Sequence, residues 1–272
     1  MSEVTDFTAW TSADAASVIA VPRPEDDKYS RGVLGIRTGS DRYPGAAVLG
    51  VEAALRTGVG MVRYVGPARP SDLVLQRRPE AVTAPGRVQA WLIGSGMDAD
   101  HREDAPLIAA LDEGVPSVLD GGALDLVRHA TSPVVLTPHF RELARLLDTD
   151  PGEVALAPAS WARRASDELG ATVLLKGTTT YVAGPGIALS VTGAPAWLAT
   201  AGAGDALGGV LGALLATRST DAAADEQLPA RLAATAALIH GHAAARASAG
   251  GPLTILDLCA QLPSVVADLV RQ

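Results

Sequence analysis

The sequence predicts an α/β fold in which a mostly parallel central sheet is covered by helices on both faces. Short apolar runs rich in β-branched residues alternate along the chain with longer segments of helical periodicity, which is the pattern of repeated βα units. The composition agrees, because 48% of the 272 residues are apolar and only 4% are aromatic. Small apolar side chains suit helices that pack closely on a parallel sheet.

Six apolar runs are predicted as strands, and each ends in glycine, proline or a polar residue. They cover residues 32–36, 61–66, 90–96, 117–122, 133–139 and 171–177. Two shorter alternating runs, 179–186 and 187–193, meet at Gly184-Pro185-Gly186. Because glycine and proline at such a junction favour a tight turn, these runs predict a hairpin at one edge of the sheet.

Seven segments between the strands carry helical patterns. They are residues 44–57, 102–113, 141–148, 160–169, 204–216, 228–249 and 256–270. The polar, acidic stretch 218–230 is predicted as a solvated loop. Since no linker or repeat divides the chain, we expect an N-terminal segment, residues 1–30, followed by a single domain, residues 31–272.

Charge and cysteine content exclude several functional classes. The formal net charge is -8 and the pI about 5.1, so no general basic surface is expected to hold nucleic acid or an anionic membrane. The single cysteine, Cys259, is expected to pack as a small apolar residue. The N-terminus lacks a signal-peptide pattern and no run is apolar enough to span a membrane, which favours a soluble cytoplasmic protein.

The loops that follow the strands predict where a ligand binds. Open α/β sheets bind ligands beyond the carboxyl ends of their strands. Polar or glycine-rich loops follow the first, third, fifth and sixth predicted strands, and another precedes the helix at 204–216. We therefore expect these five loops to form one pocket.

The stretch "ATAGAGDALGG", residues 199–209, places one acid in an otherwise bare backbone. The first N–H groups of a helix have no partner within it, so Gly202, Ala203 and Gly204 would form an anion hole there. Asp205, in the first turn, would then be placed to act as a base in phosphoryl transfer. Aspartate also commonly caps helices, and the local pattern leaves both interpretations open. The glycine spacing differs by one residue from the dinucleotide-binding fingerprint.

Two further loops carry chemistry suited to phosphate and metal. "KGTTT" supplies Lys176 and the hydroxyls of residues 178–180 for phosphate oxygens, although the same residues also suit a solvated turn. "TPHFRE" supplies His139 for a hydrogen bond to a ligand and Glu142 to hold Mg²⁺ through water. A histidine in this position is also commonly structural.

Other motifs predict no site. His240 and His242 are two residues apart on a helix and do not share a face, which disfavours a metal site. "GSGM" has Ile93 where a nucleophile elbow needs glycine, which disfavours acyl-transfer hydrolysis.

Taken in order, the motifs resemble the NAD(P)H-hydrate dehydratase family, a branch of the ribokinase-like fold, over roughly residues 31–267. They are "GSDRYPGAAVLGVEAALRTGVGMV", "RRPEAV", "GSGM", "LTPHFRELARLL", "LLKGTTTYVAGPG" and "WLATAGAGDALGGVLGALLA". The resemblance implies a ribokinase-like three-layer sandwich. It also implies an enzyme of nicotinamide nucleotide repair, which removes water from hydrated NADH and NADPH with Mg²⁺ and ADP, or less commonly ATP.

The resemblance also implies roles for individual residues. Asp205 would deprotonate the ring hydroxyl, which would accept the terminal phosphoryl group of the nucleotide before phosphate leaves. The hydrated nucleotide would contact Ala46, Gly96, His139 and Asp205. The adenine nucleotide would be held by Lys176, Gly177, Thr178, Thr179, Thr180 and Gly204, with Glu142 near the metal.

Departures from the family pattern and two alternative functions accompany the resemblance. Gly122 stands where the family has a second acid, and Ala203 stands where it commonly has serine. A ribokinase-like kinase of a sugar or vitamin precursor, or a nucleotide sensor without catalysis, would share much of this pattern. Residues 1–30 are too few for the epimerase domain that some relatives carry, so a separate NAD(P)H-hydrate epimerase is an expected partner. The family's habit implies a homo-oligomer, often a tetramer.

Overall fold

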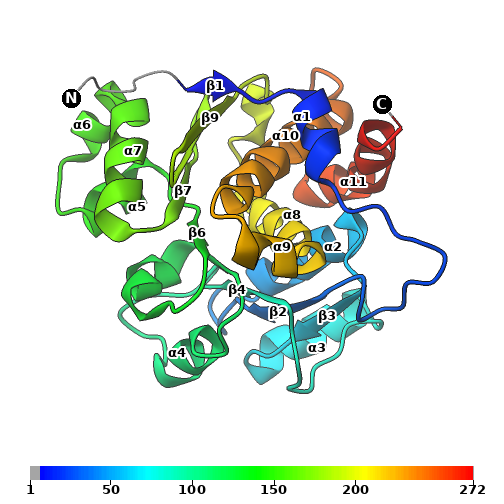
Figure 1. Ribbon diagram of the computed structural model, residues 1–272. Coiled ribbons are helices and arrows are strands. Elements are labelled where there is room, and N and C mark those ends of the chain that lie inside the picture. The colour runs from blue at the N-terminus through cyan, green and yellow to red at the C-terminus, as the bar shows by residue number, and fades with distance from the viewer. Residues whose placement is uncertain (1–6, 272) are drawn as a thin grey trace.

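The computed structural model describes residues 7–271, which build one mixed sheet of nine strands (Figure 1). The strand order is β1-β9-β8-β7-β6-β5-β4-β2-β3. The strands are β1 (Thr8–Ala9), β2 (Val33–Arg37), β3 (Met61–Tyr64), β4 (Ala90–Ile93), β5 (Ser117–Leu119), β6 (Val134–Leu136), β7 (Thr172–Leu175), β8 (Thr180–Gly184) and β9 (Ile187–Val191). All neighbours are parallel except β7 with β8 and β8 with β9. The predicted α/β class and the β8–β9 hairpin are confirmed, with the two-residue β1 beyond the hairpin.

Helices cover both faces of the sheet, as predicted. They are α1 (Ser12–Val18), α2 (Gly45–Thr57), α3 (Ala68–Arg77), α4 (Ala105–Leu111), α5 (Phe140–Leu146), α6 (Pro151–Leu156), α7 (Pro158–Leu169), α8 (Ala203–Thr217), α9 (Ser219–Ala224), α10 (Leu228–Ser248) and α11 (Ile255–Leu269), with short 3₁₀ helices at Gly121–His129 and Ala196–Leu198. In Figure 1, α2, α8, α10 and α11 lie on one side of the sheet, and α4, α5 and α7 lie on the other.

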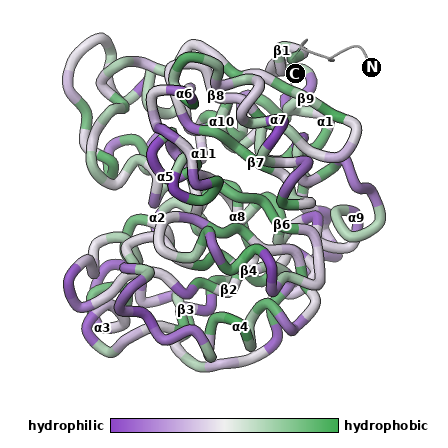
Figure 2. The backbone as a smooth tube through the Cα atoms, turned by 90° about the vertical axis from the view of Figure 1, so that its left-hand side faces the viewer, coloured by the Kyte–Doolittle hydropathy of each residue, from purple (hydrophilic) through white to green (hydrophobic). Residues whose placement is uncertain are grey.

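Side chains along each strand point alternately to the two faces of the sheet, and each face forms its own hydrophobic core. In β4, Ala90 and Leu92 join the core beneath α2, α8 and α10, whereas Trp91 and Ile93 join the core beneath α4 and α7. Figure 2 shows the hydrophobic stretches running through the central strands and α8, with hydrophilic segments around the outside. Burial on both faces is why these strands read as continuous apolar runs. Among the described residues, no helix has the length and apolar character needed to cross a membrane.

A row of glycines seats α8 against both the sheet and α2. A Cβ at Gly212 would lie 2.9 Å from Leu34 and one at Gly208 would lie 3.0 Å from Leu92. A Cβ at Gly209 would collide with the backbone of Gly50 on α2. The small residues after Asp205 therefore let the helix approach its neighbours closely, which fixes where its first turn lies.

Several helices and strands of the structure were not predicted, because their sequences show no clear helical or strand periodicity. The first 30 residues contribute β1, which pairs with β9, and α1, which packs on α10 and α11. The prediction of a solvated loop at 218–230 is wrong in part, because Ser219–Ala224 forms α9. Ala222 is fully buried there, so one packed face stabilises a helix that is otherwise polar.

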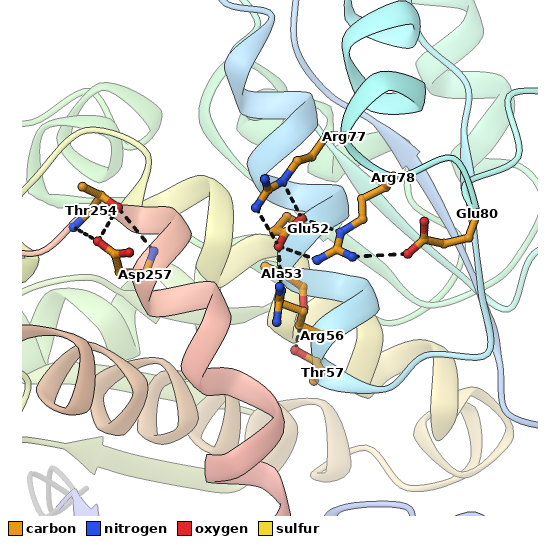
Figure 3. A network of polar contacts seen from close by, with 9 residues as sticks. All are labelled: Glu52, Ala53, Arg56, Thr57, Arg77, Arg78, Glu80, Thr254 and Asp257. Atoms are coloured by element: carbon orange, nitrogen blue, oxygen red, sulfur yellow. Dashed lines mark hydrogen bonds and ion pairs between the residues drawn. The ribbon is translucent and has the colours of Figure 1, made fainter.

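A buried ionic cluster joins α2 to the end of α3 (Figure 3). The side chain of Glu52 is fully buried and accepts hydrogen bonds from Arg56, Arg77 and Arg78. Burial alone would raise the pKa of Glu52, but the three guanidinium groups outweigh it and lower the pKa to about 2. The Glu52 carboxylate is therefore ionised, and its ion pairs with Arg77 and Arg78 attach α3 to α2. Cys259 is buried nearby on α11, as predicted.

Candidate active site

Four neighbouring strands end in polar side chains at the same edge of the sheet. Ser95 follows β4, Asp120 follows β5, His139 follows β6 and Lys176 follows β7. His139 and Lys176 form an isolated parallel bridge, in which the Lys176 N–H donates to the Pro138 carbonyl at 2.9 Å. The side chains that follow separate strands are thus brought together where parallel sheets bind ligands.

Asp120 is the most completely bonded group of this edge. One carboxylate oxygen accepts from Lys176 Nζ at 2.9 Å and from the Thr137 hydroxyl at 2.8 Å, and the other accepts from the Ser95 hydroxyl at 2.8 Å. Burial favours the neutral acid, but these three donors prevail and the pKa of Asp120 is lowered. Asp120 therefore stays ionised and fixes the position of the lysine.

The Lys176 ammonium lies between the carboxylates and the start of α8. Its Nζ is 3.8 Å from Glu142 Oε2, and a Cβ at Gly204 would lie 3.4 Å from it. Burial opposes the charged form, yet Asp120 and Glu142 raise the pKa of Lys176. The structure thus gives a fixed positive charge beside the unpaired N–H groups of a helix, which is suited to a phosphate.

Asp205 occupies the first turn of α8 and is partly buried. Gly202, at the N-cap, has no side chain to cap this helix, and the Asp205 carboxylate accepts no hydrogen bond from any described residue. Burial raises the pKa of Asp205 to about 6, the charge of Asp120 adds to the rise, and Lys176 opposes it. A carboxylate with a pKa near neutrality has the property required of a general base.

Positions 202 and 204, at the start of α8, are occupied by glycine for different physical reasons. At Gly204 the Cβ position faces only the Lys176 ammonium, in agreement with a backbone left open to an anion. Gly202 has φ +91°, and a Cβ there would lie 2.5 Å from Leu49. Backbone conformation and packing therefore also require glycine at position 202, beside the anion-binding role predicted for it.

A buried histidine supports the same helix start from α10. His240 lies beside the backbone of Ala203, and burial lowers the pKa of its imidazole to about 4. The side chain is therefore neutral at physiological pH and adds no charge to the site. The role predicted for Ala203 in the anion hole needs only its backbone N–H.

His139 and Glu142 form a capping box at the start of α5. The His139 N–H donates to Glu142 Oε2 at 2.8 Å, and the Glu142 N–H donates to His139 Nδ1 at 3.1 Å. Since Nδ1 accepts a hydrogen bond, the neutral ring carries its proton on Nε2. The half-exposed imidazole thus has a structural role and still presents a donor to a ligand.

Ala46 and Gly96 pack against each other on the opposite side of the site. Ala46 lies in the first turn of α2, and its Cβ fills the position that a side chain at Gly96 would need. The Ser40 hydroxyl donates to the Gly96 carbonyl at 2.9 Å, and the Gly39 N–H donates to the Ser95 carbonyl at 2.7 Å. The loops after β2 and β4 are thereby joined next to Asp120.

The segment after Lys176 turns directly into β8. Gly177 and Thr178 are exposed, Thr179 is half-buried, and Thr180 begins the strand. A Cβ at Gly177 would lie 2.9 Å from the Phe140 ring, so glycine keeps this turn close to α5. These residues border the site on the side of Lys176.

The departure at Gly122 has a structural basis. A Cβ at Gly122 would lie 2.5 Å from the Met97 carbonyl oxygen, which leaves no room for a second acid. The Gly122 carbonyl instead accepts a hydrogen bond from Arg102.

Sequence reasoning missed Asp120 and its partners Ser95 and Thr137. A signal was present, because Asp120 follows the apolar run 117–119 directly and so had to lie at the carboxyl edge. No signal marked Thr137, whose role depends on β6 lying beside β5.

Comparisons with known proteins identify the family of the chain. A model of the family described as NAD(P)H-hydrate dehydratase matches residues 34–260. The chain is 44% identical over 227 residues to the bifunctional NAD(P)H-hydrate repair enzyme of Mycobacterium tuberculosis, a match that covers 78% of this chain and 47% of that protein. The chain therefore spans about half the length of this relative.

Single-function relatives match over more of their length. The chain is 35% identical over 235 residues to the ADP-dependent (S)-NAD(P)H-hydrate dehydratase of Xanthomonas campestris, covering 78% of this chain and 81% of that protein. The structure of the ADP/ATP-dependent NAD(P)H-hydrate dehydratase from Bacillus subtilis, co-crystallised with ATP and Mg²⁺, superposes with a TM-score of 0.85. That match has 25% identity and covers 97% of this chain and 99% of the other.

Proposed function

Because the chain belongs to the NAD(P)H-hydrate dehydratase family, we propose that it converts hydrated NADH and NADPH back to NADH and NADPH, with ADP in preference to ATP as phosphoryl donor. The observation that supports this most directly is Asp205. Its carboxylate has a pKa of about 6 and lies at the start of α8, beside the cation Lys176. A base and a phosphate-binding element are thus adjacent, as phosphoryl transfer to a hydroxyl requires.

The proposed reaction begins with deprotonation of the ring hydroxyl by Asp205. The hydroxyl oxygen attacks the terminal phosphorus of the donor, whose bridging P–O bond breaks and leaves a nucleotide shorter by one phosphate. The ring nitrogen lone pair then expels phosphate as its C–O bond breaks. Loss of a proton from the adjacent carbon restores the double bond, so the net change is loss of water from the hydrate and hydrolysis of one phosphoanhydride.

Other residues are proposed to hold the reactants. Lys176 and the N–H groups at residues 202–204 would bind the transferred phosphoryl group. Residues 177–180, at the turn after Lys176, would bind the rest of the adenine nucleotide. The hydrated ring would lie between Ala46 and Gly96 on one side and the Nε2–H of His139 on the other.

Mg²⁺ is part of the proposal, and Glu142 is the residue that fits it. Within residues 7–271 no group of three histidine, cysteine or acidic side chains is placed to hold a metal. Glu142 Oε2 accepts from His139, whereas no hydrogen bond to Oε1 is formed by the described residues. Mg²⁺ usually keeps several waters and binds one or two carboxylates together with phosphates, which suits this single free oxygen. The ion would neutralise charge on the donor phosphates.

Three further properties remain predictions. A homotetramer is expected, and light scattering after size-exclusion chromatography measures it. A separate NAD(P)H-hydrate epimerase is the expected partner, in line with the bifunctional character of the mycobacterial repair enzyme. A cytoplasmic location is expected from the sequence.

Recovery of reduced-nicotinamide absorbance tests the proposed function. The purified protein is mixed with Mg²⁺, hydrated NADH or NADPH, and either ADP or ATP. Absorbance should return together with one phosphate per turnover, and more rapidly with ADP. If neither nucleotide restores absorbance the proposal fails, and a stable phosphorylated product would identify a kinase that stops after the first step.

A further inference from the structure

A cavity lies beside the active site, at the carboxyl ends of β2, β3 and β4. Its volume is about 770 Å³, and it is lined by Arg37 and by residues of the segments 39–43, 65–67 and 97–107. This volume is in the range of sites that enclose small-molecule ligands. We call it the β2–β4 cavity.

The β2–β4 cavity and the active site share one short segment. Ser95 donates to Asp120 in the active site, and Met97, two residues later, lines the cavity. Tyr43 lines the cavity as well, and its carbonyl is close to the Cβ position of Gly96. A ligand whose reacting end lies beside Gly96 and Asp205 can therefore extend into this cavity.

Arg37 brings a positive charge to the cavity without a carboxylate partner. No acidic group among the described residues lies within ion-pair distance of it, and its one hydrogen bond runs from Nη1 to the Val65 carbonyl at 3.2 Å. Its Nε is buried and has no hydrogen-bond partner among residues 7–271. The guanidinium lies over the Trp91 ring at 5.5 Å, and burial lowers the pKa of Arg37. A partly buried cation of this kind gains stability from an anionic ligand.

The other charges of the cavity are differently arranged. Arg102 is already paired, since its guanidinium donates to Asp125 at 2.7 and 2.8 Å and to Asp104 at 2.7 Å. Arg42 lies over the Tyr43 ring at 5.2 Å and, unlike Arg37, is exposed to solvent. Three acids, Asp41, Asp98 and Glu103, also line the cavity, so its charge is balanced and it is not broadly basic. Arg37 is therefore the cation best placed to bind one phosphate.

We propose that the β2–β4 cavity holds the adenosine diphosphate arm of the hydrated dinucleotide, and that Arg37 donates to one of its phosphates. This inference rests on the proposed function, because the hydrate is the ligand of the adjoining site that carries such an arm. The phosphate contacted is either the diphosphate bridge, which both hydrates have, or the 2′-phosphate, which only the NADPH form has. Arg37 thereby determines substrate affinity, not the chemical step.

Arg37→Met tests the inference, because methionine retains an apolar side chain over Trp91 and removes the charge. The matched control is Arg63→Met on β3, since Arg63 also has a buried Nε without a partner and donates to a backbone carbonyl, that of Ala84, outside the cavity. We expect Arg37→Met to raise KM by roughly 10-fold to 100-fold, as for loss of charge-assisted hydrogen bonds, and to leave kcat within about 2-fold. Arg37→Lys should recover part of the loss.

The two hydrates distinguish the two phosphates. A rise in KM for the NADPH hydrate alone assigns Arg37 to the 2′-phosphate, and an equal rise for both hydrates assigns it to the diphosphate bridge. An unchanged KM for both hydrates, or an equal rise in Arg63→Met, would overturn the inference.

A binding measurement separates this inference from the proposed function. With AMP present to fill the nucleotide site, calorimetry measures the affinity of ADP-ribose and of its 2′-phosphate for the wild-type chain and for Arg37→Met. Weaker binding by Arg37→Met supports the subsite even if the wild-type protein dehydrates neither hydrate. Equal affinities would refute it even if the enzyme is active.

Discussion

Replacing Asp205 by asparagine should make the protein more stable and nearly inactive. In the folded chain the pKa of Asp205 rises from 3.8 to about 6, with burial as the largest cause and the charge of Asp120 adding to it. Each pKa unit corresponds to about 1.4 kcal/mol, so ionised Asp205 costs the folded state on the order of 3 kcal/mol at pH 7. Asparagine retains the shape without the charge and should recover part of this free energy.

The sign of the effect fixes its dependence on pH. A carboxyl group whose pKa is raised on folding destabilises the protein only where the unfolded chain is ionised and the folded chain resists ionisation. The stability gain of Asp205→Asn should therefore be absent below pH 3.8, grow between pH 4 and 6, and be constant above pH 6. Thermal or urea unfolding at several pH values measures it.

Activity should change in the opposite direction. Loss of a general base lowers the rate by roughly 100-fold to 10,000-fold. In the wild-type enzyme kcat/KM should rise with pH through about 6, where Asp205 ionises, and this rise should vanish in Asp205→Asn.

Asp257→Asn is the matched control, because Asp257 also lies in the first turn of a helix but does cap it (Figure 3). Its carboxylate accepts from the Thr254 hydroxyl at 2.7 Å. This variant should lose about 0.5–2 kcal/mol of stability and keep its activity. If Asp205→Asn behaves in the same way, less stable and still active, the argument for a base is refuted.

Three further predictions follow from the geometry. Gly204→Ala should raise KM for the adenine nucleotide in steady-state kinetics and leave the melting temperature nearly unchanged, whereas Gly202→Ala should destabilise by about 1–3 kcal/mol, because of its positive φ and its contact with Leu49. Glu52→Gln should cost about 3–5 kcal/mol in urea unfolding, since it leaves three arginines around a neutral group; in the wild type the stability that this carboxylate supplies should decline as pH falls from 4.5 toward 2. Removal of Mg²⁺ with EDTA should abolish turnover and leave the unfolding midpoint unchanged, because in the part of the chain described no protein cage for a metal is formed.

Periodicity predicted the layers well because burial repeats along each element. Leu92 and Ile93 both read as apolar, and the sheet buries both of its faces. Periodicity fails for β1, since two residues have no period, and for α9, where the buried Ala222 stabilises a polar segment. Such elements depend on partners far away in the sequence.

In the candidate site, too, some residues could be predicted from local sequence, whereas others depend on contacts between distant segments. Asp205 and Lys176 stood in glycine-rich and threonine-rich stretches whose local chemistry suggested phosphate. Asp120 looked like an ordinary strand end, and only the order β4-β5-β6-β7 places it beside Lys176, Ser95 and Thr137. Arg37 likewise reads as a charged residue that ends a strand, and its lack of a partner is a property of the packed structure.

The pairing of β1 with β9 also sets an order of events during synthesis. Thr8 pairs with Leu189, and the Trp10 indole donates to Thr235 across 225 positions of sequence. Because contacts so distant form only after both partners have left the ribosome, the first described strand must wait for most of the chain before it can dock. Until then the outer edge of β9 offers unpaired backbone groups to any other extended chain, so β1 shields the sheet from unwanted association once folding is complete.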